Sequence, residues 1–179
     1  GAYSGCWGWL VTPYPTNPNK TSAHYVVKED GTEVMALVDE TDTAHHVGKP
    51  WKGLSTNSRS VGIEHGGFSY QGTNKWQTGQ IDTSIKLSCD IVKRNTGIVQ
   101  DREHIIGHYQ PDPVNRADDP GTSFPWADFM ARVNTCVGGG TPPPTGIIVD
   151  TNQANNGANA RFTAPSTNWK SSTSVSGYW

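Results

Sequence analysis

Apolar positions in the first third of the chain predict two strands joined by a tight turn. Residues 23–38, AHYVVKEDGTEVMALV, hold two β-prone runs on either side of the turn residues EDG, which is the pattern of a β-hairpin. Residues 59–67, RSVGIEHGG, form a further apolar run that ends at two glycines. We therefore expect a third strand there.

Two later segments show helical spacing instead. Residues 78–96 repeat apolar positions at spacings of four, four and three, at Ile81, Ile85, Cys89 and Val92, which predicts a helix with one buried face. Residues 125–136, PWADFMARVNTC, begin at a proline and repeat apolar residues in the same way, as expected of a second helix. Strands with intervening helices predict an α/β fold with a mixed central β-sheet flanked by helices.

A change in composition divides the chain near its C-terminal end. Residues 136–146, CVGGGTPPPTG, can neither pack a core nor continue a helix, and such stretches act as spacers. We expect a main domain over residues 1–137, a Gly/Pro linker over 138–146 and a short β-rich fragment over 147–179. A fragment of this size rarely buries enough apolar surface to fold alone, so this β tail is expected to pair with another chain or a missing domain.

Composition and charge narrow the class of protein. The chain has 179 residues, 17% charged residues and a formal net charge of −2, with no cluster of lysine and arginine, so the sequence indicates no nucleic-acid partner. No apolar run approaches the ~20 residues that span a bilayer, and no charged-then-apolar leader opens the chain. Few charges with 20 glycines and 7 tryptophans favour a secreted or cell-envelope protein.

The three cysteines allow two interpretations. Cys6, Cys89 and Cys136 contain no CxxC pair, so a cysteine zinc site has little support. Either the cysteines are small buried apolar side chains, or Cys89 and Cys136 form a disulfide bridge between the two predicted helices.

Residues 104–121, HIIGHYQPDPVNRADDPG, gather side chains that bind metals in a segment too rich in proline and glycine for regular structure. His108 follows the apolar run HII and a glycine, which predicts a position at the end of a strand facing a cleft. Asp119 comes eleven residues later, before Pro-Gly. Imidazole and carboxylate groups are suitable zinc ligands; the alternative is a surface histidine and a turn-capping aspartate.

Glu64 lies in SVGIEHG, on a strand that is expected to be buried. A carboxylate is rarely placed centrally in a sheet unless it is paired or functional. Partial burial would raise its pKa and suit it to take a proton from a metal-bound water. The alternative is a glutamate at the exposed edge of the strand.

Five motifs together resemble a known family. SAHYVV, DTAHHVG, NSRSVGIEH, HIIGHYQ and DDPG occur in the order and spacing of the zinc-dependent N-acetylmuramoyl-L-alanine amidases, relatives of the peptidoglycan-recognition proteins. The resemblance covers essentially residues 1–137. It implies hydrolysis of the amide between N-acetylmuramic acid and L-alanine in peptidoglycan, outside the cytoplasm.

The resemblance also implies roles for individual residues. His108 and Asp119 correspond to zinc ligands, and Glu64 corresponds to the general base. The histidines that line the family's substrate groove correspond to His24 and His46, for which a structural role is the alternative. Three further side chains are expected to bind sugar or peptide near that groove: Trp51, Asn57 and Tyr109.

The chain departs from the family pattern at two points. The family's first zinc histidine precedes sequence resembling GAYSG, so this ligand is expected to be absent from a chain that begins at Gly1. Two protein ligands would bind zinc weakly, so an inactive amidase is the alternative to an active one for this chain. Ala117 stands where many relatives carry a lysine that would stabilise an oxyanion. These departures favour the alternative of a non-catalytic peptidoglycan-binding module. The β tail, which is expected to need a partner sheet, favours a further alternative, a structural subunit of an extracellular assembly that reuses the fold. The β tail resembles the start of a golvesin-type β-sandwich domain.

Overall fold

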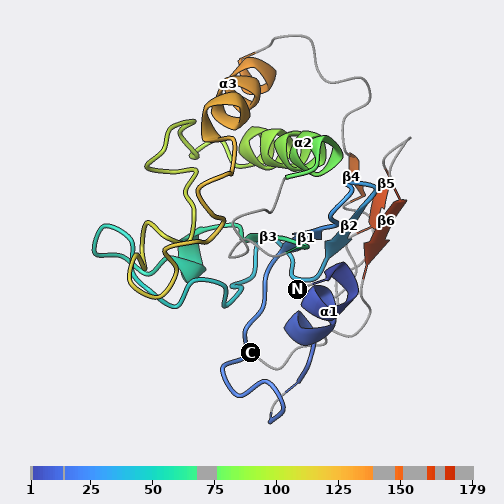
Figure 1. Ribbon diagram of the computed structural model, residues 1–179, viewed down its shortest axis with the longest axis vertical. Coiled ribbons are helices and arrows are strands. Elements are labelled where there is room, and N and C mark those ends of the chain that lie inside the picture. The colour runs from blue at the N-terminus through green and yellow to red at the C-terminus, as the bar shows by residue number, and fades with distance from the viewer. Residues whose placement is uncertain are drawn as a thin grey trace.

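The computed structural model describes residues 2–13, 15–67 and 76–138, together with the backbone of three short C-terminal strands. Its elements in chain order are α1 (Tyr3–Leu10), β1 (Tyr25–Val27), β2 (Glu33–Ala36), the 3-10 helix η1 (Asn57–Arg59), β3 (Ile63–His65), α2 (Thr78–Arg94), α3 (Trp126–Val137), β4 (Ile148–Asp150), β5 (Arg161–Thr163) and β6 (Asn168–Ser171). Figure 1 shows α1 on one side of the main sheet and α2 on the other, with α3 packed on α2.

The predicted hairpin and third strand form a mixed sheet. β1 pairs antiparallel with β2, where Val26 lies opposite Met35, and parallel with β3, where Val26 lies opposite Glu64. β6 continues the sheet beyond β2, so the strand order is β3-β1-β2-β6, and β4 pairs with β5 separately. The structure confirms the α/β fold with a mixed sheet.

The sheet has an apolar core on each face because neighbouring residues of a strand point to opposite sides. On one face, Val26 of β1 packs in a cluster with Leu10 of α1. On the other face, Val27 packs in a cluster with Leu87 and Ile91 of α2. The sheet is therefore held between helices, and β3 is brought against α2 at its outer edge.

The two predicted helices are confirmed to within two residues at each end. Their buried faces meet through a disulfide bridge between Cys89 and Cys136, whose Cα atoms lie 6.1 Å apart. This bridge decides between the two interpretations of the cysteines, and Cys6 is a free thiol. The bridge joins residues that are 47 positions apart in the chain, so it fixes α3 on α2.

The segment before His108 differs from the prediction. The sequence predicts a strand ending at His108, but residues 104–108 form turns and irregular backbone, and the prediction was wrong. The carboxylate of Asp101 accepts hydrogen bonds from the backbone N–H groups of Glu103 and His104, at 2.9 and 3.0 Å. These bonds turn the chain before its apolar run. The helix α1 was also not predicted, because its short glycine-containing sequence lacks a clear apolar period.

The C-terminal part of the chain leaves several predictions open. α3 ends at Val137, the expected end of the main domain, but most of the predicted linker lies outside the described residues, so the domain division stays a prediction. The pairing of the β tail with another chain also stays a prediction, as does its golvesin-type character. None of the described helices is long and apolar enough to cross a membrane.

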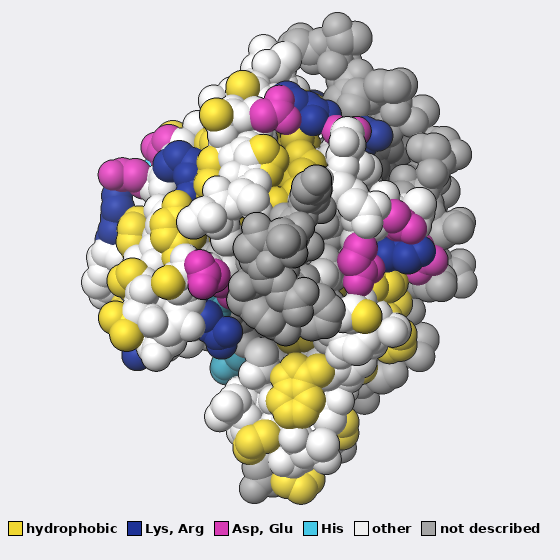
Figure 2. All heavy atoms as spheres, in the orientation of Figure 1, with side chains coloured by type: hydrophobic (Ala, Val, Ile, Leu, Met, Phe, Trp, Pro, Cys, Tyr) yellow, Lys and Arg dark blue, Asp and Glu magenta, His cyan; other side chains and the backbone are white. Residues whose placement is uncertain are grey.

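Charges of both signs lie side by side on the surface. On the face seen in Figure 2, lysine and arginine side chains lie next to aspartate and glutamate. Ion pairs between described residues include Arg132 with Asp82, at 2.7 Å, and Lys52 with Glu103. Exposed pairs of this kind contribute little to stability, typically about 0–1 kcal/mol each.

A more buried ion pair connects the sheet to the end of α2. The Tyr25 hydroxyl donates a hydrogen bond of 2.6 Å to Glu40, and the Arg94 guanidinium lies 2.6 Å from the same carboxylate oxygen. Asn95 donates to the other oxygen at 2.8 Å. Burial alone would raise the pKa of Glu40, but the hydrogen bonds from Arg94 and Tyr25 and the charge of Arg94 bring it below its usual 4.5.

Replacing Glu40 with glutamine is expected to lower the free energy of unfolding near neutral pH and to weaken its dependence on acid pH. In the unfolded chain Glu40 takes up a proton as the pH falls through 4.5, whereas in the folded protein it stays ionised to lower pH. Its contribution to stability is therefore complete above pH 4.5 and is lost as the pH falls through the lower folded pKa. Urea denaturation over this pH range measures the effect.

The matched control is Glu103→Gln, because the Glu103 side chain is 64% exposed. This variant is expected to keep the pH dependence of the unmodified chain. Equal pH dependence in the Glu40 variant and the unmodified chain would contradict the role of the Glu40 cluster.

Candidate active site

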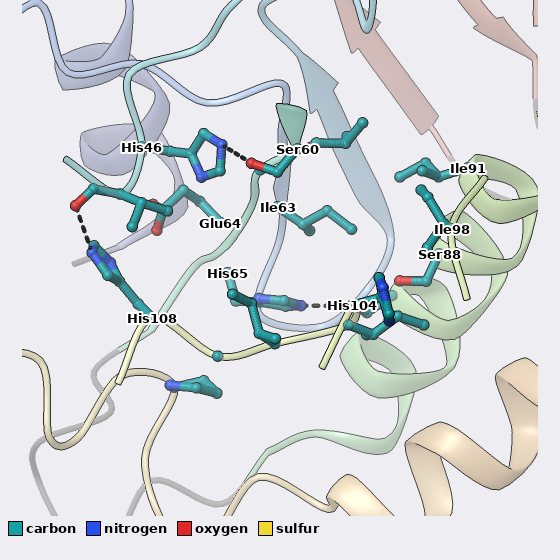
Figure 3. A pocket seen from close by; sticks show the side chains of 18 of the residues that line it. His46, Ser60, Ile63, Glu64, His65, Ser88, Ile91, Ile98, His104 and His108 are labelled. Atoms are coloured by element: carbon teal, nitrogen blue, oxygen red, sulfur yellow. Dashed lines mark hydrogen bonds between the residues drawn. The ribbon is translucent and has the colours of Figure 1, made fainter. Parts of the chain in front are cut away.

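A cavity of about 890 Å³ opens between β3, one face of α2 and the loops that contain His46 and His108. This volume lies within the range of small-molecule sites, roughly 300–1,000 Å³. Glu64, His108 and Asp119 all line it, as does His46. Figure 3 shows His46, Glu64 and His108 gathered on one side of the cavity. The structure therefore brings together the three residues for which the sequence predicts chemistry.

His108 is held by a backbone carbonyl on one side and a carboxylate on the other. Its Nε2 lies 3.1 Å from the carbonyl oxygen of Val47, and its Nδ1 lies 3.3 Å from Oδ2 of Asp119. A carbonyl oxygen only accepts hydrogen bonds, so Nε2 carries a proton. Burial by itself would lower the pKa of His108, but the hydrogen bond and the charge of Asp119 raise it.

The loop between His108 and Asp119 is closed on itself. The backbone N–H of Tyr109 donates to the carbonyl of Asp119 at 3.0 Å, which brings the two ends of the loop together. A Cβ on Gly107 would lie 2.7 Å from the Tyr109 ring and 2.8 Å from Cδ of Pro120. A side chain at position 107 would therefore clash with both rings, and only glycine leaves room for this close approach.

Glu64 occupies the middle of β3 and is half-buried. Burial raises the pKa of its carboxyl, and the negative charge of Asp119 raises it further, while His108 opposes the shift. Glu64 therefore lies close enough to Asp119 and His108 for their charges to change its pKa. A carboxyl group with a raised pKa is suited to accept and return a proton near neutral pH. β3 is an edge strand among the described strands, but Glu64 faces a cavity and not open solvent.

The residue next to Glu64 points the other way. His65 directs Nε2 to the hydroxyl of Ser84 on α2, at 2.8 Å, because alternate residues of a strand face opposite sides. Burial lowers the pKa of His65 to about 4, so its imidazole is neutral. His65 thus attaches β3 to α2 and leaves Glu64 as the strand's ionisable group on the side of His108.

His46 is neutral as well, with one tautomer favoured. Its Nε2 lies 3.1 Å from the hydroxyl oxygen of Ser60, whose proton is donated to the Thr56 carbonyl at 2.6 Å. The hydroxyl oxygen therefore accepts, and Nε2 of His46 donates. Burial, followed by the charges of His24 and His108, lowers the pKa of His46 to about 4. A Cβ on Gly62 would lie 2.5 Å from the His46 ring, so the ring packs directly on the backbone before β3.

His24 is placed differently from His46. It has no exposed surface, and it is not among the residues that line the cavity. Its Nδ1 accepts a hydrogen bond of 2.9 Å from the backbone of Gly62, and its Nε2 lies 3.2 Å from the Asp42 carbonyl. Both ring nitrogens are thus satisfied within the fold, and the predicted role of His24 in substrate binding stays a prediction.

The other predicted substrate-binding residues fall into two groups. Trp51 lines the cavity. Asn57 does not line it; its side-chain oxygen accepts hydrogen bonds from the backbone N–H groups of His46 and Val47, at 3.2 and 2.9 Å. The Tyr109 hydroxyl accepts a hydrogen bond of 3.0 Å from Arg102. Asn57 and Tyr109 therefore shape the loops around the cavity, and their contacts with substrate stay predictions.

Three contributors to the site were not found from the sequence. The Val47 carbonyl could not have been found, because any residue type supplies this group. Ser60 lies inside the recognised motif NSRSVGIEH, where its hydroxyl was a signal that could have been used. Arg102 lies just before the loop, and nothing in the local pattern distinguishes it from a surface arginine.

Nδ1 of His108 and Oδ2 of Asp119 are the candidate donor atoms for a zinc ion. No group of three His, Cys, Asp or Glu side chains that could hold a metal occurs within the described ranges. Two ligands of a tetrahedral zinc, each about 2.0–2.1 Å from the ion, lie about 3.3–3.4 Å apart, and the separation of Nδ1 of His108 from Oδ2 of Asp119 is 3.3 Å. The Val47 carbonyl supplies the second hydrogen bond that metal-binding histidines usually make. This pair therefore fits two positions of a zinc site.

Comparisons with known proteins agree with this geometry. Residues 1–122 match the family described as N-acetylmuramoyl-L-alanine amidase. The fold is similar to the crystal structure of a selenomethionine derivative of AmpD, with a TM-score of 0.55 and 29% identity, covering 63% of this chain and 60% of that chain. No curated protein sequence matches the chain.

A second solved structure is also similar. It is the N-acetylmuramyl-L-alanine amidase AmiD from E. coli, in complex with the substrate anhydro-N-acetylmuramic acid-L-Ala-D-gamma-Glu-L-Lys. The TM-score is 0.61 at 25% identity, covering 74% of this chain and 53% of that chain. This chain thus spans 53–60% of the length of the two solved chains. Because the family match covers more than half of the chain and includes Glu64, His108 and Asp119, the chain belongs to the N-acetylmuramoyl-L-alanine amidase family.

Proposed function

We propose that this domain is a zinc-dependent hydrolase that cleaves the amide between N-acetylmuramic acid and L-alanine in peptidoglycan. The observation that carries the proposal is the arrangement of His108, Asp119 and Glu64 around one cavity. Family membership supports it, as does the similarity to AmiD, whose complex contains a muramoyl peptide. A non-catalytic binding module would have no need of this trio.

His108 and Asp119 would hold the metal through Nδ1 and Oδ2, as two of its protein ligands. A bound zinc lowers the pKa of its water towards ~7 and polarises the carbonyl to be cleaved. The Val47 carbonyl accepts the proton on Nε2 of His108, so Nδ1, which faces Asp119, is the nitrogen that would bind the metal once it has lost its own proton to Asp119 or solvent. The ligand pair is therefore oriented before any substrate arrives.

Glu64 would supply the proton transfers. Its raised pKa, caused by burial and by Asp119, suits a carboxylate that takes a proton from the attacking water and returns it to the departing alanine nitrogen. His46 stays neutral and adds no competing positive charge next to His108. Trp51 lines the cavity and offers a flat apolar face on which a sugar ring can stack.

We propose a location in the cell envelope or outside the cell. Peptidoglycan, the proposed substrate, lies there. The Cys89–Cys136 disulfide supports this location, because such bridges persist mainly in oxidising compartments. Treatment of intact producing cells with a membrane-impermeant thiol reagent and fractionation would show whether the chain is exported.

The function is tested by measuring bound zinc and the release of peptide from N-acetylmuramoyl-L-Ala-D-γ-Glu-L-Lys, with added zinc. We expect hydrolysis at this amide bond by a chain that also carries the family's first zinc histidine, and weaker zinc binding and hydrolysis by this chain, in which His108 and Asp119 supply two ligands. His108→Ala is expected to lose zinc affinity by more than the 10–100-fold typical of changes to residues that only support a ligand, and to lose activity.

The matched control for His108→Ala is His45→Ala. The His45 side chain is exposed and does not line the cavity, so this variant is expected to keep zinc and activity. If a zinc-saturated chain that carries the family's first zinc histidine binds the muropeptide and releases no peptide, the binding-module alternative holds and the hydrolase proposal is wrong.

A further inference from the structure

Arg102 contacts the loop of His108 at several points although it does not line the cavity. One guanidinium nitrogen donates to the carbonyl of Ile105. The other donates to the Tyr109 hydroxyl at 3.0 Å and to the side-chain oxygen of Gln110 at 2.6 Å. The guanidinium therefore binds groups that precede His108 and groups that follow it.

Gln110 also donates a hydrogen bond back to Arg102. Its side-chain nitrogen donates to the carbonyl of Arg102 at 2.9 Å. Its side-chain oxygen, already bound by Arg102, also accepts the backbone N–H of Gly107 at 3.1 Å. Arg102 and Gln110 thus form a closed network around the backbone of residues 105–110, with His108 in the middle.

The same guanidinium is fixed against α3. Its central carbon lies 3.3 Å from the centroid of the Trp126 ring, a stacking contact worth about 0.5–2 kcal/mol depending on burial. Trp126 opens α3 and packs on Phe124, with ring centroids 4.4 Å apart. Because α3 is joined to α2 by the disulfide, Arg102 attaches the loop to this crosslinked helix pair.

The chemistry of these contacts requires arginine. None of the ion pairs between described residues includes Arg102, and its partners are neutral oxygens and a ring face. A planar guanidinium can stack on an indole while its edges donate in several fixed directions, whereas a lysine ammonium is a point charge with no planar fork. These contacts therefore hold the loop in position, and they do not neutralise a charged side chain.

We infer that Arg102 is a positioning residue that holds the imidazole of His108 between the Val47 carbonyl and Asp119. The distances that it fixes are the 3.1 Å from Nε2 to Val47 and the 3.3 Å from Nδ1 to Asp119. The functional meaning of this position rests on the proposed function, in which His108 binds zinc. The contacts that hold this position are made by protein groups alone, so they can be tested separately from metal binding.

The inference is tested with Arg102→Ala and Arg102→Lys in the full chain. Both variants are expected to weaken zinc binding by about 10–100-fold, as loss of a supporting group does, measured by competition with a chromophoric chelator. Lysine is expected not to rescue binding, because it keeps the charge and loses the stacked fork. The second measurement is the ¹⁵N spectrum of the His108 ring without metal, in which we expect both variants to weaken the protonated Nε2 signal.

The matched control is Arg132→Ala. Arg132 lies on α3 and pairs with Asp82 and Asp128, so its loss affects α3 without touching the loop. It is expected to keep zinc affinity within about twofold and an unchanged His108 spectrum, with melting temperatures recorded for all variants. If Arg102→Ala does not fold, Arg102→Lys decides the question.

Two outcomes would overturn the inference. One is unchanged zinc affinity and an unchanged His108 spectrum in the Arg102 variants. The other is an equal loss in Arg132→Ala, which would indicate general destabilisation. An unmodified chain that binds no zinc would contradict the proposed function alone, because the His108 spectrum would still show whether Arg102 positions the ring.

Discussion

Replacing Glu64 with glutamine is expected to lower the rate of muropeptide hydrolysis by about 10²–10⁴-fold, the usual contribution of a general acid–base residue. Glutamine has the shape of glutamate but cannot accept the proton of the attacking water. Because burial and Asp119 disfavour the charged carboxylate, the neutral side chain is expected to leave the melting temperature unchanged or higher. Initial rates of peptide release, with zinc content and thermal unfolding recorded in parallel, measure the effect.

The comparison variant is Glu33→Gln, a half-buried glutamate on β2 that does not line the cavity. It is expected to keep near-normal hydrolysis. Muropeptide binding by Glu64→Gln is expected to persist, so that the loss appears in kcat and not in KM. Near-normal kcat in Glu64→Gln would mean that another group moves the proton and that Glu64 has a structural role on β3.

Removing the disulfide with Cys89→Ala and Cys136→Ala is expected to lower the free energy of unfolding by about 4 kcal/mol. The estimate follows from the loop-closure entropy of the unfolded chain for cysteines 47 residues apart. This is a large share of the roughly 5–15 kcal/mol that stabilises a typical domain. Alanine is the better replacement because both sulfurs are buried and a serine hydroxyl there would need a hydrogen-bond partner.

Urea denaturation of the double variant, and of the unmodified chain with and without reductant, gives the value. Cys6→Ala is the control, since Cys6 is a half-buried free thiol and its loss removes no crosslink. A double variant as stable as the oxidised chain would show that the packing of α2 on α3 holds these helices without the bridge.

Local sequence patterns predicted those helices and strands whose structure depends mainly on residues within the element itself. The turn EDG between two β-prone runs predicted the hairpin of β1 and β2, and the spacing of apolar residues predicted α2 and α3 to within two residues at each end. The same reasoning failed for the apolar run before His108. There, the carboxylate of Asp101 and the guanidinium of Arg102 occupy the backbone groups that a strand would use.

At the site, too, motifs identified candidate residues, but only the packing showed how each side chain is placed. The motifs singled out Glu64, His108 and Asp119, and they gave His24 and His46 the same two alternatives, a place at the substrate groove or a structural role. The structure buries His24 with both ring nitrogens bonded, whereas His46 lines the cavity, and the binding of substrate by either stays a prediction. A histidine that lines a cavity and one that braces the backbone beside it have the same local sequence signal. Only the packing around each ring separates His46 from His24.

The sequence by itself determined the strands β1 to β3, the helices α2 and α3, the family and the residue types available for chemistry, because these depend on side-chain period and on motifs along the chain. Only the tertiary structure decided which atoms meet: Nδ1 of His108 with Asp119, its Nε2 with the Val47 carbonyl, and Arg102 with Trp126. Each of these contacts joins residues at least eleven positions apart. Their strength depends on distance, direction and exclusion of water, none of which is encoded in a local pattern.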